Sequence, residues 1–86
     1  MKELREFVNR QNAMAKVFNR SVLNLASAAD RQTIAESIDC QLSPENLSCD
    51  GELPRSEVDR RYRFLTRAAR QLLALDPSVQ IYEYSE

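Results

Sequence analysis

Four arginines recur at helical spacing in the second half of the chain. They are Arg60, Arg63, Arg67 and Arg70. On an α-helix, spacings of three, four and three residues place these side chains in one narrow arc. Arginine forks bind phosphate groups bidentately, so the row is suited to contacting a nucleic-acid backbone. The alternative is a solvated or protein-contacting helix face, in which Glu57 pairs with Arg61 and Asp59 pairs with Arg63.

A polar segment spanning residues 46–57 has oxygen-bearing side chains at the spacing of calcium ligands. The segment resembles the twelve-residue loop of the EF-hand family, in which early oxygen ligands, a central glycine and a final bidentate glutamate hold the ion. The resemblance implies weak ligation by Asn46, Ser48, Asp50 and Glu57 through their side chains and by Glu52 through its carbonyl. It departs from the family at Pro54 and before the loop at Pro44. The alternative is a polar turn followed by a helix start, because Asp-Gly pairs are common turn signals.

The composition excludes several kinds of catalytic site. The chain has no histidine, so it lacks an imidazole base and any histidine-ligated metal. Its single glycine rules out the glycine-rich loops that cradle phosphates. Cys40 and Cys49 are expected to be free thiols with no imidazole to activate them. We therefore expect no enzyme activity, no cofactor and no small-molecule substrate.

Charge is balanced in total but separated along the chain. The chain has twelve Lys and Arg and thirteen Asp and Glu, yet residues 7–29 carry only basic charges and residues 38–54 only acidic ones. Such blocks favour pairing across the fold or between two copies. The isoelectric point near 5.5 is acidic, whereas dedicated nucleic-acid binders usually exceed about 9. The start of the chain lacks a signal-peptide pattern and no long apolar run follows, so we expect a cytoplasmic protein that does not enter a membrane.

Two amphipathic helices must position these residues. Apolar side chains recur at helical spacing through the first half, which predicts a helix over about 2–38. Ser27 with Asp30, and Thr33 with Glu36, resemble capping boxes, so a break near 27–30 stays open. The second helix is predicted over about 54–75, because Pro77 disfavours helix in the residue before it.

The rest of the chain forms a connector and a tail. In the connector, 41–54, we expect a short helical turn over 44–50, with Ser43 as its N-cap and Pro44 at the first helical position, and a left-handed residue at Gly51. Residues 77–86 are expected to pack on the helices as an extended tail, or to form a strand that pairs only in a dimer. The predicted fold is all-α: one domain over 1–86, a helical hairpin or three-helix unit with a structured connector and a short tail.

The two helices carry more large apolar side chains than they can cover mutually. The candidate partner-binding residues are Phe7, Met14, Phe18, Phe64 and Tyr82. Excess apolar surface on a small domain is typical of a protein that binds a partner or a second copy of itself. We therefore expect a protein-binding module of accessory, adaptor or inhibitor type. The alternative is a nucleic-acid-binding regulator that uses the arginine row, and a minor one is weak calcium binding.

Overall fold

The computed structural model describes residues 1–84, and within that range the chain is all-α, with no strand. The helices are α1 (Lys2–Val17), α2 (Ala28–Leu42), α3 (Pro44–Ser48) and α4 (Arg55–Leu75). This confirms the predicted fold class. Residues 85–86, the end of the predicted tail, lie outside the described part of the chain. None of these helices combines the length and apolar composition needed to cross a bilayer.

The amphipathic pattern of the first half is divided between two helices. α1 ends at Val17, and Asn19 adopts the left-handed conformation with φ 56°. The amide of Arg20 donates to the carbonyl of Ala15 at 2.7 Å, and the amide of Asn19 donates to that of Lys16 at 3.3 Å. This pair of bonds is a Schellman motif, which satisfies carbonyls at the end of a helix. Asparagine tolerates the left-handed conformation better than most residues, so it can end a helix without glycine.

The capping box at Ser27 marks the start of α2. Its hydroxyl oxygen accepts a hydrogen bond from the amide of Asp30 at 3.3 Å. The other candidate box starts no helix, because Thr33 lies inside α2 and its hydroxyl donates to the carbonyl of Ala29. The first half is therefore interrupted, but the interruption spans residues 18–27, which have no regular structure, and is not confined to the predicted region near 27–30. The helix predicted to continue to about residue 26 already ends at Val17, where Asn19 turns the chain, and α2 extends to Leu42, beyond the predicted end near 38.

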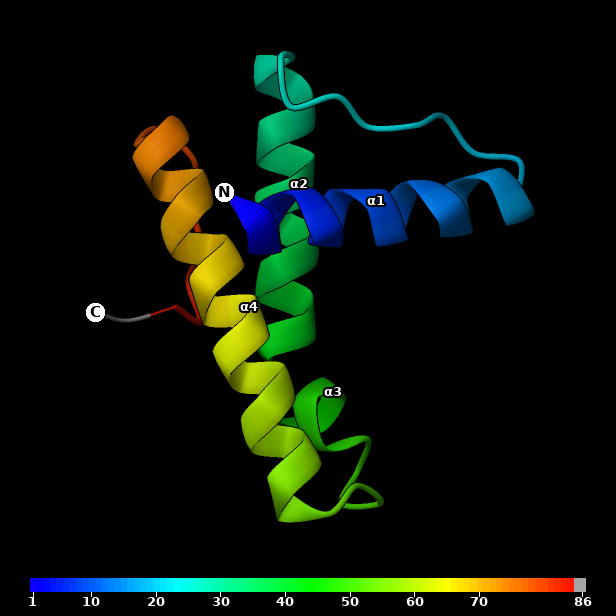
Figure 1. The fold of residues 1–86 in the computed structure, drawn as a ribbon, viewed down its shortest axis with the longest axis vertical. Coiled ribbons are helices and arrows are strands. Elements are labelled where there is room, and N and C mark those ends of the chain that lie inside the picture. Colours follow the sequence, from blue (N-terminus) through cyan, green and yellow to red (C-terminus); the bar gives the residue numbers. More distant parts are fainter. Residues whose placement is uncertain (85–86) are drawn as a thin grey trace.

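α4 is the helix on which the other three assemble. α1 packs on α4 and crosses α2 at a steep angle in the view, while α2 runs beside α4 and α3 lies near its beginning (Figure 1). Alanines at the centre allow close approach of the helices, because Ala35, Ala68 and Ala69 are fully buried. The larger buried side chains of the core are Leu4, Phe7, Val8, Ile34, Ile38, Leu42, Leu65, Leu72 and Val79.

Residues 77–84, the described part of the tail, pack on the helices without forming a strand, which agrees with one of the two predicted arrangements. Val79 is buried in the core. The carboxylate of Asp39 accepts hydrogen bonds from the amides of Tyr82 at 3.1 Å and Glu83 at 2.7 Å. A side chain of α2 thus accepts hydrogen bonds from tail amides that a neighbouring strand would otherwise bind through its backbone.

The connector turns through three consecutive left-handed residues. Cys49, Asp50 and Gly51 have φ values of 50°, 57° and 85°. The left-handed conformation of Gly51 was predicted, and glycine is the residue that adopts it without a steric cost. Ser43 precedes α3 with Pro44 at the first helical position, but its hydroxyl donates back to the carbonyl of Cys40 and does not cap the helix.

Candidate protein-binding surfaces

The end of α1 exposes a group of apolar side chains. Val17 and Phe18, the C-cap residue, follow Met14 by three and four residues, so all three lie toward the same side of the end of α1. Each is more than half exposed, and Val17 reaches 75%. Val22, in the segment after the helix, is also more than half exposed. We call Met14, Val17 and Phe18 the α1 apolar end.

This surface is exposed because of how α1 is attached. The first half of the helix buries its apolar side chains, whereas the second half extends beyond the α2–α4 pair (Figure 1). Gln71 fixes the beginning of α1: its side-chain oxygen accepts from the amide of Leu4 at 2.9 Å, and its nitrogen donates to Glu3 at 2.7 Å. The returning segment is fixed by Asn12, whose carboxamide makes two hydrogen bonds with the backbone of Leu23.

One basic side chain lies beside the α1 apolar end. The guanidinium of Arg20 lies over the ring of Phe18, 5.6 Å from its centre. Lys16 is exposed on the last turn of α1, but it follows Met14 by two residues and so lies on the opposite side of the helix. Within residues 1–84, no carboxylate forms an ion pair with either side chain. The surface therefore combines an apolar centre with an uncompensated basic edge.

The other predicted apolar residues lie elsewhere. Phe7 is only 2% exposed and belongs to the core, so its inclusion among partner-binding side chains was wrong for this structure. Phe64 is half-buried, with the guanidinium of Arg10 4.7 Å from its ring centre. Tyr82 is highly exposed on the tail. The five predicted residues therefore do not form a single face.

The predicted arginine row is exposed along α4, but its side chains have intramolecular partners. Nη1 of Arg60 lies 3.5 Å from a carboxylate oxygen of Glu57. Nε of Arg63 donates to the backbone carbonyl of Asp59 at 3.4 Å. The expected pairs, Glu57 with Arg61 and Asp59 with Arg63 through its carboxylate, are not present.

The later part of the row faces α1 and the tail. Nε of Arg70 donates to the hydroxyl of Tyr84 at 3.5 Å. The pKa of Glu3 is lowered chiefly by the hydrogen bond from Gln71, and the charge of Arg67 adds to the effect. The row is thus partly used to hold neighbouring elements together.

The EF-hand-like segment does not form a ligand loop. Asn46 and Ser48 lie in α3, where Asn46 Nδ2 donates to the carbonyl of Cys40 at 2.8 Å and the Ser48 hydroxyl donates to that of Pro44 at 2.8 Å. Glu57, the predicted bidentate ligand, pairs with an arginine instead. Residues 1–84 contain no group of three acidic or cysteine side chains placed to hold a metal ion. This geometry does not fit the calcium site that the resemblance implied.

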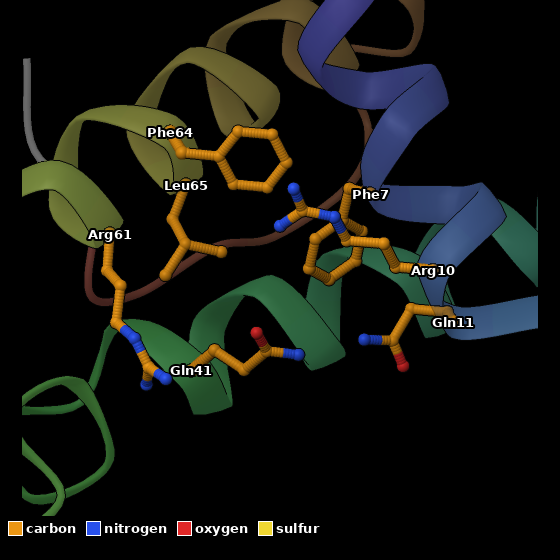
Figure 2. A pocket seen from close by; sticks show the side chains of 7 residues that line it. All are labelled: Phe7, Arg10, Gln11, Gln41, Arg61, Phe64 and Leu65. Atoms are coloured by element: carbon orange, nitrogen blue, oxygen red, sulfur yellow. The ribbon is translucent and has the colours of Figure 1, made fainter. Parts of the chain in front are cut away.

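A cavity of about 190 Å³ lies where α1, α2 and α4 meet. Its apolar side is formed by Phe7, Phe64 and Leu65. Its polar side chains come from all three helices: Arg10 and Gln11 from α1, Gln41 from α2 and Arg61 from α4. In Figure 2 the carboxamides of Gln11 and Gln41 point toward one another, and the guanidinium of Arg10 lies between the two phenyl rings.

The polar side chains of this cavity differ in whether they have partners. Arg10 forms an ion pair with Glu6 at 2.7 Å. Arg61 has no carboxylate partner within residues 1–84, and Nη1 of this arginine donates to the sulfur of Cys49 at 3.6 Å. The carboxamides of Gln11 and Gln41 make no hydrogen bond within the same range. The cavity therefore presents one uncompensated positive charge and unused hydrogen-bond donors and acceptors.

The sequence did not reveal this cavity. Gln11 and Gln41 are thirty residues apart and belong to no motif, and Arg61 lies outside the arc of the predicted arginine row. A helical wheel of α4 does place Arg61 toward the apolar face, which is the one signal available. Which residues of α1 and α2 lie across the cavity from Arg61 depends on the angle at which the helices cross.

Comparisons of the chain with protein-family models, with curated proteins and with solved structures give no significant match.

Proposed function

We propose that this protein is a non-enzymatic helical module that binds another protein through the α1 apolar end. The observation that carries the proposal is the exposure of Met14, Val17 and Phe18 on one side of the end of α1. Contiguous exposed apolar side chains on a small domain are typical of interaction sites, since their contact with water is unfavourable.

The chemistry of the α1 apolar end indicates the kind of partner. An amphipathic helix that offers apolar side chains at spacings of three and four residues commonly binds in an apolar groove. The charge of Arg20, which lies over the ring of Phe18, favours a groove with acidic side chains at its rim. A partner with these properties would cover both parts of the surface.

Nucleic acid is the second candidate partner, because Arg60, Arg63, Arg67 and Arg70 are all exposed. We rank it lower on two observations. The chain carries a net charge of −1, which opposes binding to a polyanion. Arg60 also pairs with Glu57, so part of the positive charge of the row is compensated.

Photo-crosslinking from the α1 apolar end tests the proposal and identifies the partner. Benzoylphenylalanine placed at position 18 is expected to crosslink to a second protein in the native host. The same group at position 62, where Tyr62 is exposed on α4, is the control and should give no such product. Equal crosslinking from both positions would contradict the proposal, and a product of twice the mass of this chain would assign the surface to a second copy instead.

Charge introduced at the same place supplies the quantitative test. Val17→Glu puts a carboxylate at the most exposed residue of the α1 apolar end, so it should leave the fold intact. If Val17 lies at the centre of the interface, the variant is expected to weaken binding by about 30-fold or more, which is the loss that defines an interface hot spot. Asn9→Glu, on the exposed polar side of α1, is the matched control and should bind as the wild type does. Binding of the identified partner is measured by calorimetry, and an unchanged affinity of the Val17 variant would contradict the assignment.

A further inference from the structure

We infer that the cavity between α1, α2 and α4 is a second binding site, which receives an acidic side chain next to an apolar residue in a peptide segment of a protein partner. The site is distinct from the α1 apolar end and shares no residue with it. Its polar groups and its size both restrict what can bind there.

The charge of the cavity favours an anionic group. Of the guanidinium groups around it, that of Arg10 is paired with Glu6, whereas that of Arg61 has no carboxylate partner within residues 1–84. An adjoining hollow shares Arg10, Arg61 and Phe64 and adds Arg60, itself paired with Glu57. A bound carboxylate would compensate the charge of Arg61 with the forked geometry that guanidinium and carboxylate groups share.

The carboxamides favour a peptide. Gln11 and Gln41 face one another across the cavity (Figure 2) and make no hydrogen bonds within the described residues. Each carboxamide both donates and accepts, as the backbone of an extended peptide also does. The two side chains are therefore suited to binding the backbone on either side of an acidic residue.

The apolar walls and the volume limit the occupant further. Phe7 and Leu65 are buried but line the cavity, so a bound group contacts apolar carbon as well as the polar rim. A volume of about 190 Å³ lies below the 300 to 1,000 Å³ that is usual for small-molecule sites. A single side chain with adjacent backbone suits this size better than a free cofactor.

Selection from a random peptide library displayed on phage tests the inference. The full chain is immobilised, and enriched peptides are expected to carry Asp or Glu beside an apolar residue. No enrichment, or enriched peptides without an acidic residue, would overturn the proposal.

Variants locate the binding of the enriched peptides. Arg61→Gln should weaken it by about tenfold or more, because a charged hydrogen bond is lost. Arg63→Gln removes the same charge from the exposed side of α4 and should leave affinity unchanged. Val17→Glu should also have no effect, and loss of binding in that variant would move the peptides to the α1 apolar end and overturn the inference. Unchanged peptide affinity in the Arg61→Gln variant would also overturn the inference.

Nuclear magnetic resonance gives a direct reading of the site. On addition of an enriched peptide, the side-chain amide signals of Gln11 and Gln41 should shift, while that of Asn46, hydrogen-bonded to Cys40, should not. A single-stranded DNA 20-mer serves as the competing ligand. If the DNA shifts the two glutamine signals and the peptide does not, the site binds phosphate and the peptide proposal is wrong.

Discussion

At Asp76, immediately after α4, one carboxylate gathers hydrogen bonds from two parts of the chain. The amide and hydroxyl of Ser78 donate to one oxygen, and Nε of Arg31 donates to the other at 2.7 Å. These interactions, the hydrogen bond from the Ser78 hydroxyl first and that from Arg31 second, lower the pKa of Asp76 to about 2. Because Arg31 lies on α2, the pair ties the end of α4 to the neighbouring helix.

Asp76→Asn is expected to destabilise the protein at neutral pH and to lose this effect in acid. The folded state lowers the pKa of Asp76 below the ordinary value of 3.8, so the carboxylate stabilises the fold fully above that value. The contribution disappears as the pH falls through about 2. Urea unfolding at pH 7, 4 and 2 measures the free energy of unfolding of the wild type and the variant. The difference between the two proteins should be smaller at pH 2 than at pH 7.

Asp59→Asn is the control for this titration. Asp59 is an exposed aspartate on α4 whose carboxylate forms no ion pair within residues 1–84. Its replacement should change unfolding little at any of the three pH values. If the difference in unfolding free energy between the wild type and Asp76→Asn stays constant between pH 7 and 2, the carboxylate charge does not stabilise the fold.

At the scale of helices, the end of one element and the start of the next are set by short-range bonds. Asn19 ends α1 through its left-handed conformation, and Ser27 begins α2 by accepting from the amide of Asp30. The two signals divide a continuous amphipathic pattern into two helices. As a result, the end of α1 projects and its apolar side chains stay exposed.

Ser27→Ala is expected to lower the free energy of unfolding by about 1 kcal/mol, the usual effect of losing an N-cap. Thr33→Ala is a matched control, since this threonine belongs to the other capping-box pattern but lies inside α2. Alanine has the higher helix propensity, so the control should be neutral or slightly stabilising. Thermal and urea unfolding give both values, and equal losses in the two variants would argue against a capping role for Ser27.

At the scale of the whole molecule, the tail completes the core. Among residues 77–84 Val79 is the buried one, and Tyr82, three positions later, is highly exposed. Since the amides of Tyr82 and Glu83 bond to Asp39 through the backbone, the position of the tail does not depend on the tyrosine ring. The core thus draws on residues from both ends of the chain.

Val79→Ala should cost about 1.5 kcal/mol of unfolding free energy, because it removes two buried methyl equivalents. Tyr82→Ala removes a larger side chain from an exposed position and should change stability by less than about 0.5 kcal/mol. Chemical denaturation of the two variants gives the comparison. A greater loss for Tyr82 than for Val79 would show that the tail packs differently from the structure.

Short-range features of the chain were predictable from the sequence alone. Apolar periodicity gave the all-α class, and Pro77 with the pattern before it gave the end of α4, which stops at Leu75. The cap at Ser27 and the left-handed Gly51 followed from the chemistry of single residues. These features depend on interactions within one turn of helix or one loop, which neighbouring residues determine.

Only the tertiary structure decided which side chains are buried and which meet. Phe7 and Phe18 occupy the same apolar stripe of the sequence, yet the first lies in the core and the second in solvent, because α1 crosses the other helices with its first half alone. The cavity likewise joins Gln11, Gln41 and Arg61, which no local pattern connects. Helix crossing depends on the packing of many long-range contacts, and a helical wheel contains no information about it.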